Sequence, residues 1–338
     1  MTNRPPSPDP DPPARSAWLR FARVVLPVVV SVSLLAYLAH TIDLRAARGH
    51  LSRDTALRFA VPLLLWNFAT LAIEAHCLHR VTATCGRAVD RATAARIKAA
   101  CYLLSLVHYA AGAAALALLL RRRMGTGLAE AASAVFLIAL LDMGSVIGLA
   151  VLATAWLPEI GSALRGGLLI AFLISVVGGF AFLRTRRSLG PLERLRELEV
   201  LRAVRTIPAR RLVELVVLRM LFVASYVGLT AALFLAFDVE IDLVPLALKV
   251  SILLVISALP IAAAGLGPAQ LAFVTLFSGS ASDAELLSMS VLLSLGLTSA
   301  RALLGLAFSR ELVHEVLELQ SSMRAASTRS SRDDSRRS

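Results

Sequence analysis

The sequence predicts an all-α polytopic membrane protein, with about six spanning helices and two re-entrant hairpins arranged as an inverted repeat. Of its 338 residues, 57% are hydrophobic and 17% are charged, whereas soluble domains have about 45–50% apolar and about 25% charged residues. Several apolar stretches approach or exceed the roughly 18 residues that cross a hydrocarbon core. The basic residues gather between these stretches, as the positive-inside rule expects for cytoplasmic loops.

The chain begins with a polar lead, residues 1–22, that contains "RPPSPDPDPP". Such a proline-rich stretch cannot hold a helix or fill a core, so we expect disorder. The first apolar stretch follows it without a small-residue cleavage site, which indicates a retained helix rather than a signal peptide. The apolar stretches lie at 23–41, 59–79, 99–120, 130–157, 167–183, 212–237, 243–260, 268–279 and 284–308.

Charge sets the predicted topology. Residues 184–211 hold nine Arg against three Glu, so we expect this linker in the cytoplasm. Its "LERLRELEVLRAV" has apolar positions at helical spacing, which favours an amphipathic helix along the inner surface. The acidic "DVEID", Asp238 to Asp242, is expected outside. We predict a multi-pass protein of the cell inner membrane with both termini in the cytoplasm.

The stretch 99–120 has basic residues on both sides. Five basic residues and one acid precede it from Arg80 to Lys98, and Arg121 to Arg123 follow it. Both flanks therefore prefer the inside, and the stretch should enter and leave on one face as a re-entrant hairpin. Its centre, "YAAGAAA", has the small residues that let two half-helices pack closely.

The stretch "SALPIAAAGLGPAQLAFVTLF", Ser257 to Phe277, is apolar but contains two prolines, two glycines one residue apart and a glutamine. Segment 268–279 is too short to span a bilayer. Since "DVEID" is expected outside and the tail after Ser309 inside, residues 243–279 should form a second hairpin from the opposite face. A broken helix leaves unpaired backbone groups, which are tolerated only inside protein or beside water. We expect this hairpin to line a polar cavity.

The two hairpins share the pattern G-x3-L-A-x11-A-E, which begins at Gly112 and at Gly267. Three crossings lie between the copies, so a direct repeat in sequence becomes an inverted repeat in the membrane, as in many secondary transporters. The chain therefore divides into a tail at 1–22, a first membrane half at 23–183 with hairpin 99–120, a linker at 184–211, a second half at 212–308 with hairpin 243–279, and a polar cytoplasmic tail at 309–338.

The net charge of +12 does not indicate a nucleic-acid partner, because the chain has no basic soluble domain. The expected partners are membrane lipids with anionic head groups. The three cysteines form no C-x-x-C pair, so neither a disulfide framework nor a metal site is predicted. We find no Ser/His dyad with adequate spacing, no paired acids poised for metal and no phosphate-cradling glycine loop. We therefore predict no catalytic residue and no cofactor, and expect that the protein is not an enzyme.

Three motifs resemble one known family. "LPIAAAGLGPAQ" resembles the Pro-…-Gly-Leu-Gly-x-x-Glu signature of the lysylphosphatidylglycerol synthetase transmembrane-region family, a flippase-like family of bacterial and archaeal membrane proteins. "SARALLGL", Ser299 to Leu306, is similar to the family's Arg-containing last helix, and "LLDMGSVIGL", Leu140 to Leu149, to its Asp-containing helix. The resemblance covers roughly residues 20–315. It implies the lipid-translocating part without the aminoacyl-transferring domain.

The sequence departs from the family pattern at several positions. Gln270 stands where the family has an acid, and Ala269 where it has Arg. In the first half, His108 and "AAG" replace the family's Asn and Pro-Gly turn. The Arg that usually precedes Asp142 is absent.

Charged residues within apolar stretches are functional candidates, because each costs roughly 2.5–3.5 kcal/mol at a membrane helix centre. Asp142 is the deepest acid and should pair with Arg219 or Arg301, either facing a cavity or as a structural ion pair between helices. Arg301 matches the family's Arg and can hold a lipid phosphate through its guanidinium, or snorkel toward the inner surface. Glu74 is expected near the interface with His76 and His79, where water solvates it.

The remaining predicted substrate-binding residues belong to the two hairpin turns. His108 in the first turn can hydrogen-bond a freed carbonyl or a lipid head group. Gln270 can donate and accept hydrogen bonds within the second turn, and we expect a polar site there. The second turn contributes Pro260, Gly265, Gly267 and Gln270 to the predicted site.

The sequence favours a flippase-like protein that moves an amphipathic lipid or lipid-linked precursor through a polar cavity. Two alternatives stay open at this point. The protein can be a non-catalytic membrane partner of a lipid-modifying or glycosyltransferring enzyme, or an intramembrane lipid-processing enzyme, against which the missing catalytic motifs argue.

Overall fold

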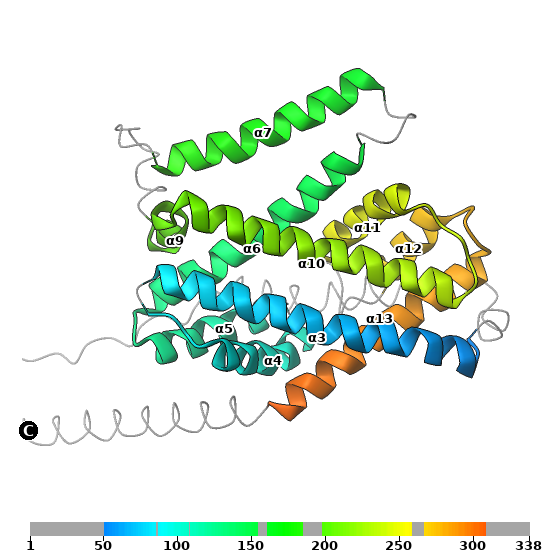
Figure 1. The fold of residues 1–338 in the computed structure, drawn as a ribbon, viewed down its shortest axis with the longest axis horizontal. Coiled ribbons are helices and arrows are strands. Elements are labelled where there is room, and N and C mark those ends of the chain that lie inside the picture. The colour runs from blue at the N-terminus through cyan, green and yellow to red at the C-terminus, as the bar shows by residue number, and fades with distance from the viewer. Residues whose placement is uncertain are drawn as a thin grey trace, which may run out of the picture.

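The computed structural model describes residues 51–85, 87–107, 109–154, 161–184, 198–258 and 267–308. The elements within these ranges are all helices (Figure 1), which confirms the all-α membrane class. Five are long and apolar enough to cross a membrane. The predicted span 23–41 and both tails lie outside the described residues, so the total of about six spans stays a prediction. The five are α3 (Arg53–Thr84), α6 (Leu128–Thr154), α7 (Ser162–Arg184), α10 (Ala209–Ala236) and α13 (Asp283–Ala307).

Polar residues set where these helices begin. The hydroxyl of Ser52 accepts a hydrogen bond from the backbone N–H of Thr55 at 3.0 Å and so caps α3. Ser282 caps α13 in the same way, through the backbone N–H of Glu285 at 3.3 Å. Because these caps lie in polar sequence, the helices extend beyond the apolar stretches, and α3 is longer at both ends than the predicted stretch 59–79.

The first predicted hairpin corresponds to two helices, α4 (Arg91–Val107) and α5 (Tyr109–Met124), each too short to be a candidate span. They pack against each other and extend beyond the predicted limits 99–120. The close approach depends on Gly112, where a Cβ would lie 1.9 Å from the Ser105 hydroxyl oxygen. The small residues of this stretch therefore bring the two arms together, as the sequence indicates.

The second predicted hairpin corresponds to α11 (Leu243–Ala258) and α12 (Pro268–Phe277), which also contact each other. Residues 259–266, which include the predicted turn, lie outside the described residues. Gly267 precedes α12 with φ of 91°, a backbone conformation that glycine adopts without strain. The two helix pairs lie toward opposite ends of the bundle (Figure 1). The inverted repeat itself stays a prediction.

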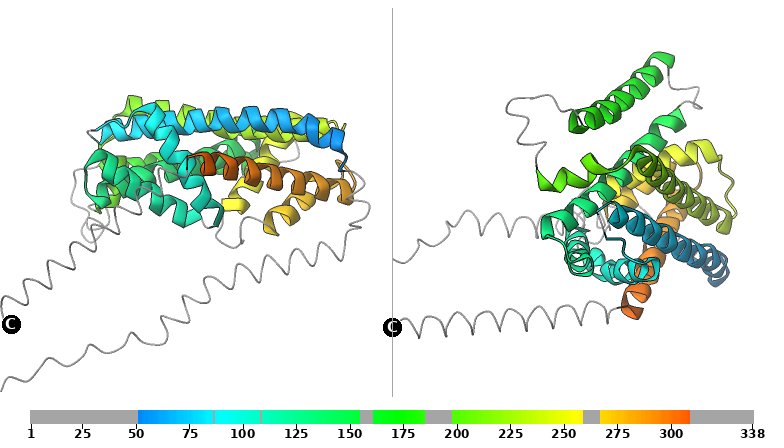
Figure 2. Two further views of the ribbon diagram at one scale, coloured as in Figure 1. Left: turned by 90° about the horizontal axis from the view of Figure 1, so that it is seen from below. Right: turned by 60° about the vertical axis from the view of Figure 1, so that its left-hand side comes forward.

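Helix α7 differs from the other long helices. It stands apart from the bundle in two views (Figures 1 and 2), and none of its residues is buried. It contacts α6 and the short helix α9 (Arg202–Thr206). Lipid therefore can surround most of α7.

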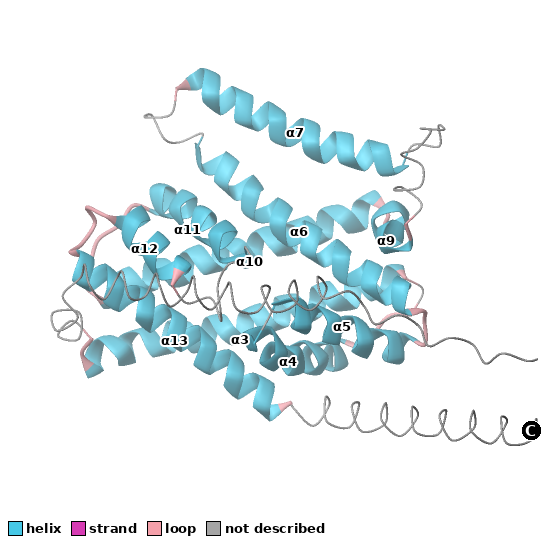
Figure 3. Ribbon diagram, turned by 180° about the vertical axis from the view of Figure 1, so that it is seen from behind, coloured by secondary structure: helices cyan, strands magenta, loops and turns pink. Residues whose placement is uncertain are grey.

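The described part of the linker consists of a 3-10 turn, η1 (Glu199–Leu201), and α9. Ala203, Val204 and Ile207 are buried, and the backbone N–H of Ala203 donates to the Ser133 hydroxyl of α6 at 2.7 Å. This part of the linker therefore packs against the bundle. Residues 192–197 of the predicted amphipathic helix lie outside the described residues, so its position along the inner surface stays a prediction. Figure 3 shows α9 at the end of α10, seen from behind.

The described part of the bundle has two large apolar cores, one toward each end, and a small third cluster of Leu71, Ala99 and Tyr102. The first combines the C-terminal half of α3 with α4, α5, the N-terminal half of α6 and the start of α10. The second combines the N-terminal half of α3 and the C-terminal half of α10 with α11, α12 and α13. Each core thus contains one of the two helix pairs, and α3, α6 and α10 run from one core to the other.

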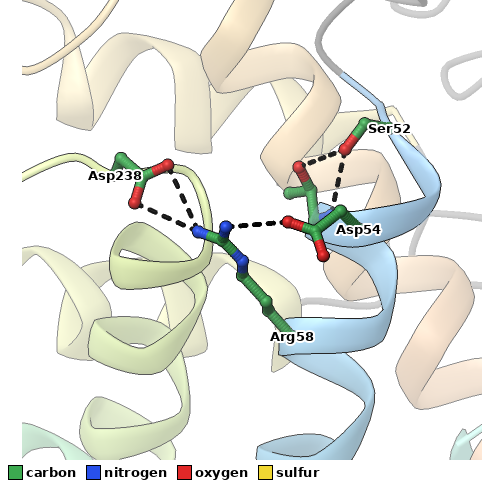
Figure 4. A network of polar contacts seen from close by, with 5 residues as sticks. Ser52, Asp54, Arg58 and Asp238 are labelled. Atoms are coloured by element: carbon green, nitrogen blue, oxygen red, sulfur yellow. Dashed lines mark hydrogen bonds and ion pairs between the residues drawn. The ribbon is translucent and has the colours of Figure 1, made fainter.

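Ion pairs join α3 to α10 at both ends. At one end, Arg58 lies between Asp54, 2.8 Å away, and Asp238, 3.3 Å away (Figure 4). At the other end, Arg80 pairs with Glu214 at 2.5 Å. The two helices are therefore antiparallel neighbours along their length. Exposed pairs such as these contribute about 0–1 kcal/mol each, so they orient the helices more than they stabilise them.

Candidate functional site

A cluster of charged side chains lies between the two apolar cores. We call it the central charge cluster, and it consists of Glu74 on α3, Lys98 and Tyr102 on α4, Asp142 on α6, Arg219 on α10 and Arg301 on α13. The charges of Lys98, Arg219 and Arg301 all act on the Glu74 carboxylate. Five helices therefore bring their polar residues to one place inside an otherwise apolar bundle.

Asp142 and Arg219 form an ion pair that contains the most buried side chain of the cluster. Their Oδ1 and Nη1 atoms lie 2.9 Å apart, and the Arg219 side chain is only 1% exposed, against 36% for Asp142. At 1.5 Å per residue, Arg219 stands about 15 Å and Asp142 about 18 Å from the nearer end of its helix. The structure thus selects Arg219 from the two partners that the sequence predicts for Asp142.

Glu74 is held by two residues of α4. Its Oε1 atom lies 3.1 Å from the Lys98 ammonium, and its Oε2 atom accepts a hydrogen bond from the Tyr102 hydroxyl. The Glu74 and Lys98 side chains are 12% and 18% exposed. Residues 98 and 102 lie one turn apart on α4, so both reach the same carboxylate from one helix face.

Arg301 joins the cluster from α13. Its guanidinium carbon lies 5.6 Å from the centre of the Tyr102 ring, a cation–π distance. Its charge also acts on Tyr226 of α10. Among the described residues Arg301 forms no ion pair with a carboxylate, so its guanidinium has hydrogen-bonding capacity left for a ligand.

The cores on either side fix the position of the cluster. On α3, Trp66 belongs to one core and Ala75 to the other, with Glu74 between them. On α10, Arg219 stands between Leu215 of the first core and Val227 of the second. On α3 and α10 the charges therefore lie where the helix passes from one apolar core to the next.

Gln270 uses both ends of its side-chain amide within the second half. Its Oε1 atom accepts the backbone N–H of Gly267 at 2.6 Å, and its Nε2 atom donates to the Ser294 hydroxyl at 2.9 Å. The side chain is 1% exposed. Gln270 thus donates and accepts as the sequence predicts, but these bonds cap α12 and attach it to α13, and neither joins the charge cluster.

Three other predicted site residues lie outside the part that the structure describes. These are His108 in the first turn and Pro260 and Gly265 in the second. The expectation that these turns line a polar cavity stays a prediction. Of the eight predicted residues, the structure brings Asp142 and Arg219 into contact and places Arg301 against Tyr102 of the same cluster.

Sequence reasoning missed three members of the cluster, Glu74, Lys98 and Tyr102. The prediction that Glu74 lies at the water interface is wrong, because α3 continues ten residues beyond it and its side chain is largely buried. Lys98, predicted only as one of the basic residues before the stretch 99–120, lies within α4. One signal was present, since Glu74 falls within the apolar stretch 59–79, and an acid there needs a partner.

Among the described residues, no group of three or more His, Cys, Asp or Glu side chains is placed to hold a metal ion. No curated protein matches the chain. The profile of the family described as "Lysylphosphatidylglycerol synthase TM region" matches residues 24–309. This range contains every helix of the bundle and the whole central charge cluster. The chain therefore belongs to the family of the lysylphosphatidylglycerol synthase transmembrane region.

Proposed function

We propose that the protein translocates an amphipathic lipid with an anionic, phosphate-containing head group across the membrane, and that the central charge cluster binds the head group on its way. The observation that carries this proposal is the balance of charges. Lys98, Arg219 and Arg301 oppose the carboxylates of Glu74 and Asp142, so three cations against two anions leave one positive charge in excess.

The cost of the cluster supports a functional role. Each charge within a membrane helix costs roughly 2.5–3.5 kcal/mol, and a buried ion pair is often no more stabilising than apolar residues of the same size. A bundle selected for stability alone would fill this position with apolar side chains. The cluster is better explained by a polar substrate that must pass between two apolar cores.

The chemistry of the exposed members suits a phosphate group. Arg301 is partly exposed, and its planar guanidinium can donate two parallel hydrogen bonds to phosphate oxygens. Lys98 adds a compact positive charge from α4. The head group would exchange its water for these donors while the acyl chains stay in the bilayer.

The test is transport by the purified protein in vesicles that contain a fluorescent phosphatidylglycerol. Movement between leaflets is followed by chemical quenching of the outer leaflet. We expect Arg301→Gln to slow movement about tenfold or more, because a charged hydrogen bond contributes about 1.5–3 kcal/mol. Lys249→Gln is the matched control, since Lys249 lies on α11 above the Phe277 ring and outside the cluster. A folded wild-type protein that moves no lipid would refute the proposal. Equal transport rates for Arg301→Gln and Lys249→Gln would show that the central charge cluster does not bind the head group.

One observation favours a second candidate function, that of a non-catalytic membrane partner for a lipid-modifying enzyme. Helix α7 buries none of its residues, although it is long enough to span the membrane. Transmembrane helices with an unoccupied face can pack against another protein. A photo-crosslinking residue at Leu164 or Ile174 tests this. Crosslinks to a lipid-modifying enzyme in native membranes would support the second function, and crosslinks to lipid alone would count against it.

A further inference from the structure

Glu74 is the one carboxylate of the cluster whose partners a head group can take away. Its partner Lys98 is 18% exposed, whereas Arg219, the partner of Asp142, is 1% exposed. An incoming phosphate can therefore reach Lys98 but not displace Asp142 from Arg219. The two buried pairs differ in how easily a ligand can open them.

The groups that face Glu74 come from every helix packed around it. Lys98 and Tyr102 contact it from α4. Arg219 on α10 and Arg301 on α13 act on it through space, and Asp142 on α6 acts on Lys98. His76, on α3 itself, faces Glu214 at 3.7 Å instead. Cations surround Glu74, and the donors that neutralise its charge are the same donors a phosphate would use.

Competition between a phosphate and Glu74 for these donors changes the protonation of Glu74. When a phosphate oxygen takes Lys98, the Glu74 carboxylate loses its ion-pair partner in a site of low dielectric. An unpaired carboxylate in such a site is costly and takes up a proton rather than remain charged. Proton uptake also leaves the net charge of the cluster at its excess of one positive charge, because the one negative charge of a phosphodiester enters together with one proton.

We propose that Glu74 couples lipid translocation to proton uptake, so that one proton enters the cluster with each head group. This inference rests on the proposed function. The proton comes from water on the side where the head group enters and binds a carboxylate oxygen of Glu74 as the Lys98–Glu74 pair opens. It leaves to water on the other side when the head group departs and the pair re-forms. No covalent bond to the lipid is made or broken.

Tyr102 acts as a positioning residue for this step. Its hydroxyl donates to Glu74 while its ring lies against Arg301. The ring therefore links the carboxylate that takes the proton to a cation that binds the phosphate. The variant Tyr102→Phe removes the hydroxyl donor and keeps the ring. A carboxylate that loses a hydrogen-bond donor is less stable in its charged form. The variant should therefore shift the pH dependence of proton uptake toward higher pH.

The first experiment measures proton uptake when a soluble short-chain lipid binds. Purified protein in a weakly buffered detergent solution receives dioctanoyl phosphatidylglycerol, and a pH-sensitive dye reports the protons taken up. We expect roughly one proton for each bound lipid in the wild type, and none in Glu74→Gln, whose side chain cannot ionise. Glu214→Gln is the matched control, because Glu214 pairs with Arg80 at the end of the bundle and outside the cluster.

The second experiment uses vesicles with an imposed pH gradient. Lipid movement from the acidic to the alkaline side should be faster than without the gradient in the wild type, and independent of the gradient in Glu74→Gln. If Glu74→Gln does not fold, the test is instead whether Tyr102→Phe shifts the pH dependence of proton uptake. Binding and movement without proton uptake or gradient dependence would overturn the coupling and leave the proposed function intact. If folded wild-type protein neither binds nor moves the lipid, both the proton coupling and the proposed function would be overturned.

Discussion

The carboxylate of Asp142 lies 2.9 Å from the guanidinium of Arg219, and the arginine is almost completely buried. The pair joins α6 to α10 between two apolar cores. An arginine in this position depends on its carboxylate, because a buried charge without a partner is among the most destabilising features a protein can have.

We predict that Asp142→Asn lowers the free energy of unfolding by about 3–5 kcal/mol, since it leaves the positive charge of Arg219 buried. Thermal unfolding in detergent measures the change. The double variant Asp142→Asn with Arg219→Met should recover much of the loss, because it removes both charges. Asp238→Asn is the control, and its exposed pair with Arg58 should contribute at most about 1 kcal/mol. Equal losses for Asp142→Asn and Asp238→Asn would contradict the central position of the Asp142 pair.

Gly112 and Ser105 set the distance between α4 and α5. A Cβ at residue 112 would overlap the Ser105 hydroxyl, so Gly112→Ala should cost about 1–3 kcal/mol through overpacking. Gly228, on α10, has nothing within 4 Å of the same position. Gly228→Ala should therefore be neutral or stabilise the helix by about 0.5–1 kcal/mol. Unfolding curves of both variants check the prediction, and equal destabilisation would show that the contact does not matter.

Gln270 supplies the acceptor for the backbone N–H of Gly267, the N-cap residue of α12. Gln270→Leu removes this acceptor and leaves the Gly267 N–H buried without its bond, at a cost of about 1–3 kcal/mol. Gln270→Glu takes up a proton in this buried site. Its carbonyl oxygen can still accept from Gly267 and its O–H can donate to Ser294, so its stability should lie closer to that of the wild type. Unfolding measurements on the two variants distinguish them, and a less stable Glu variant would contradict this role.

The two helix pairs should return to the membrane face from which they enter. In a background without cysteines, new cysteines replace exposed residues beside each pair, at Arg96 and Arg122 for α4–α5 and at Glu240 and Ser278 for α11–α12. We expect an impermeant thiol reagent to label the first two from one side of the membrane and the other two from the opposite side. Labelling of positions 96 and 122 from different faces would make the first pair an ordinary span.

The topology that charge predicts agrees with how α3 and α10 lie. Asp238 stands at the end of α10 where Arg58 of α3 can reach it, and Glu214 stands at the start of α10 beside Arg80. Antiparallel neighbours of this kind require an even number of crossings between them, and α6 and α7 supply two if the pair α4–α5 returns to the face from which it enters. The agreement supports the predicted order of segments.

The local sequence determined the helical class and the position of each described span to within several residues. It also indicated the short helix pairs α4–α5 and α11–α12. These features could be predicted because hydropathy, length and glycine or proline content are properties of a single segment. The sequence also identified Asp142 with Arg219 as one of its two candidate partners. Only the tertiary structure decided that Glu74, Lys98 and Tyr102 meet. Glu74 seemed close to the end of an apolar stretch, but α3 continues to Thr84 and places it between two cores. Whether a charge is solvated or paired depends on which helix packs beside it, and that contact is made between segments that the sequence keeps apart.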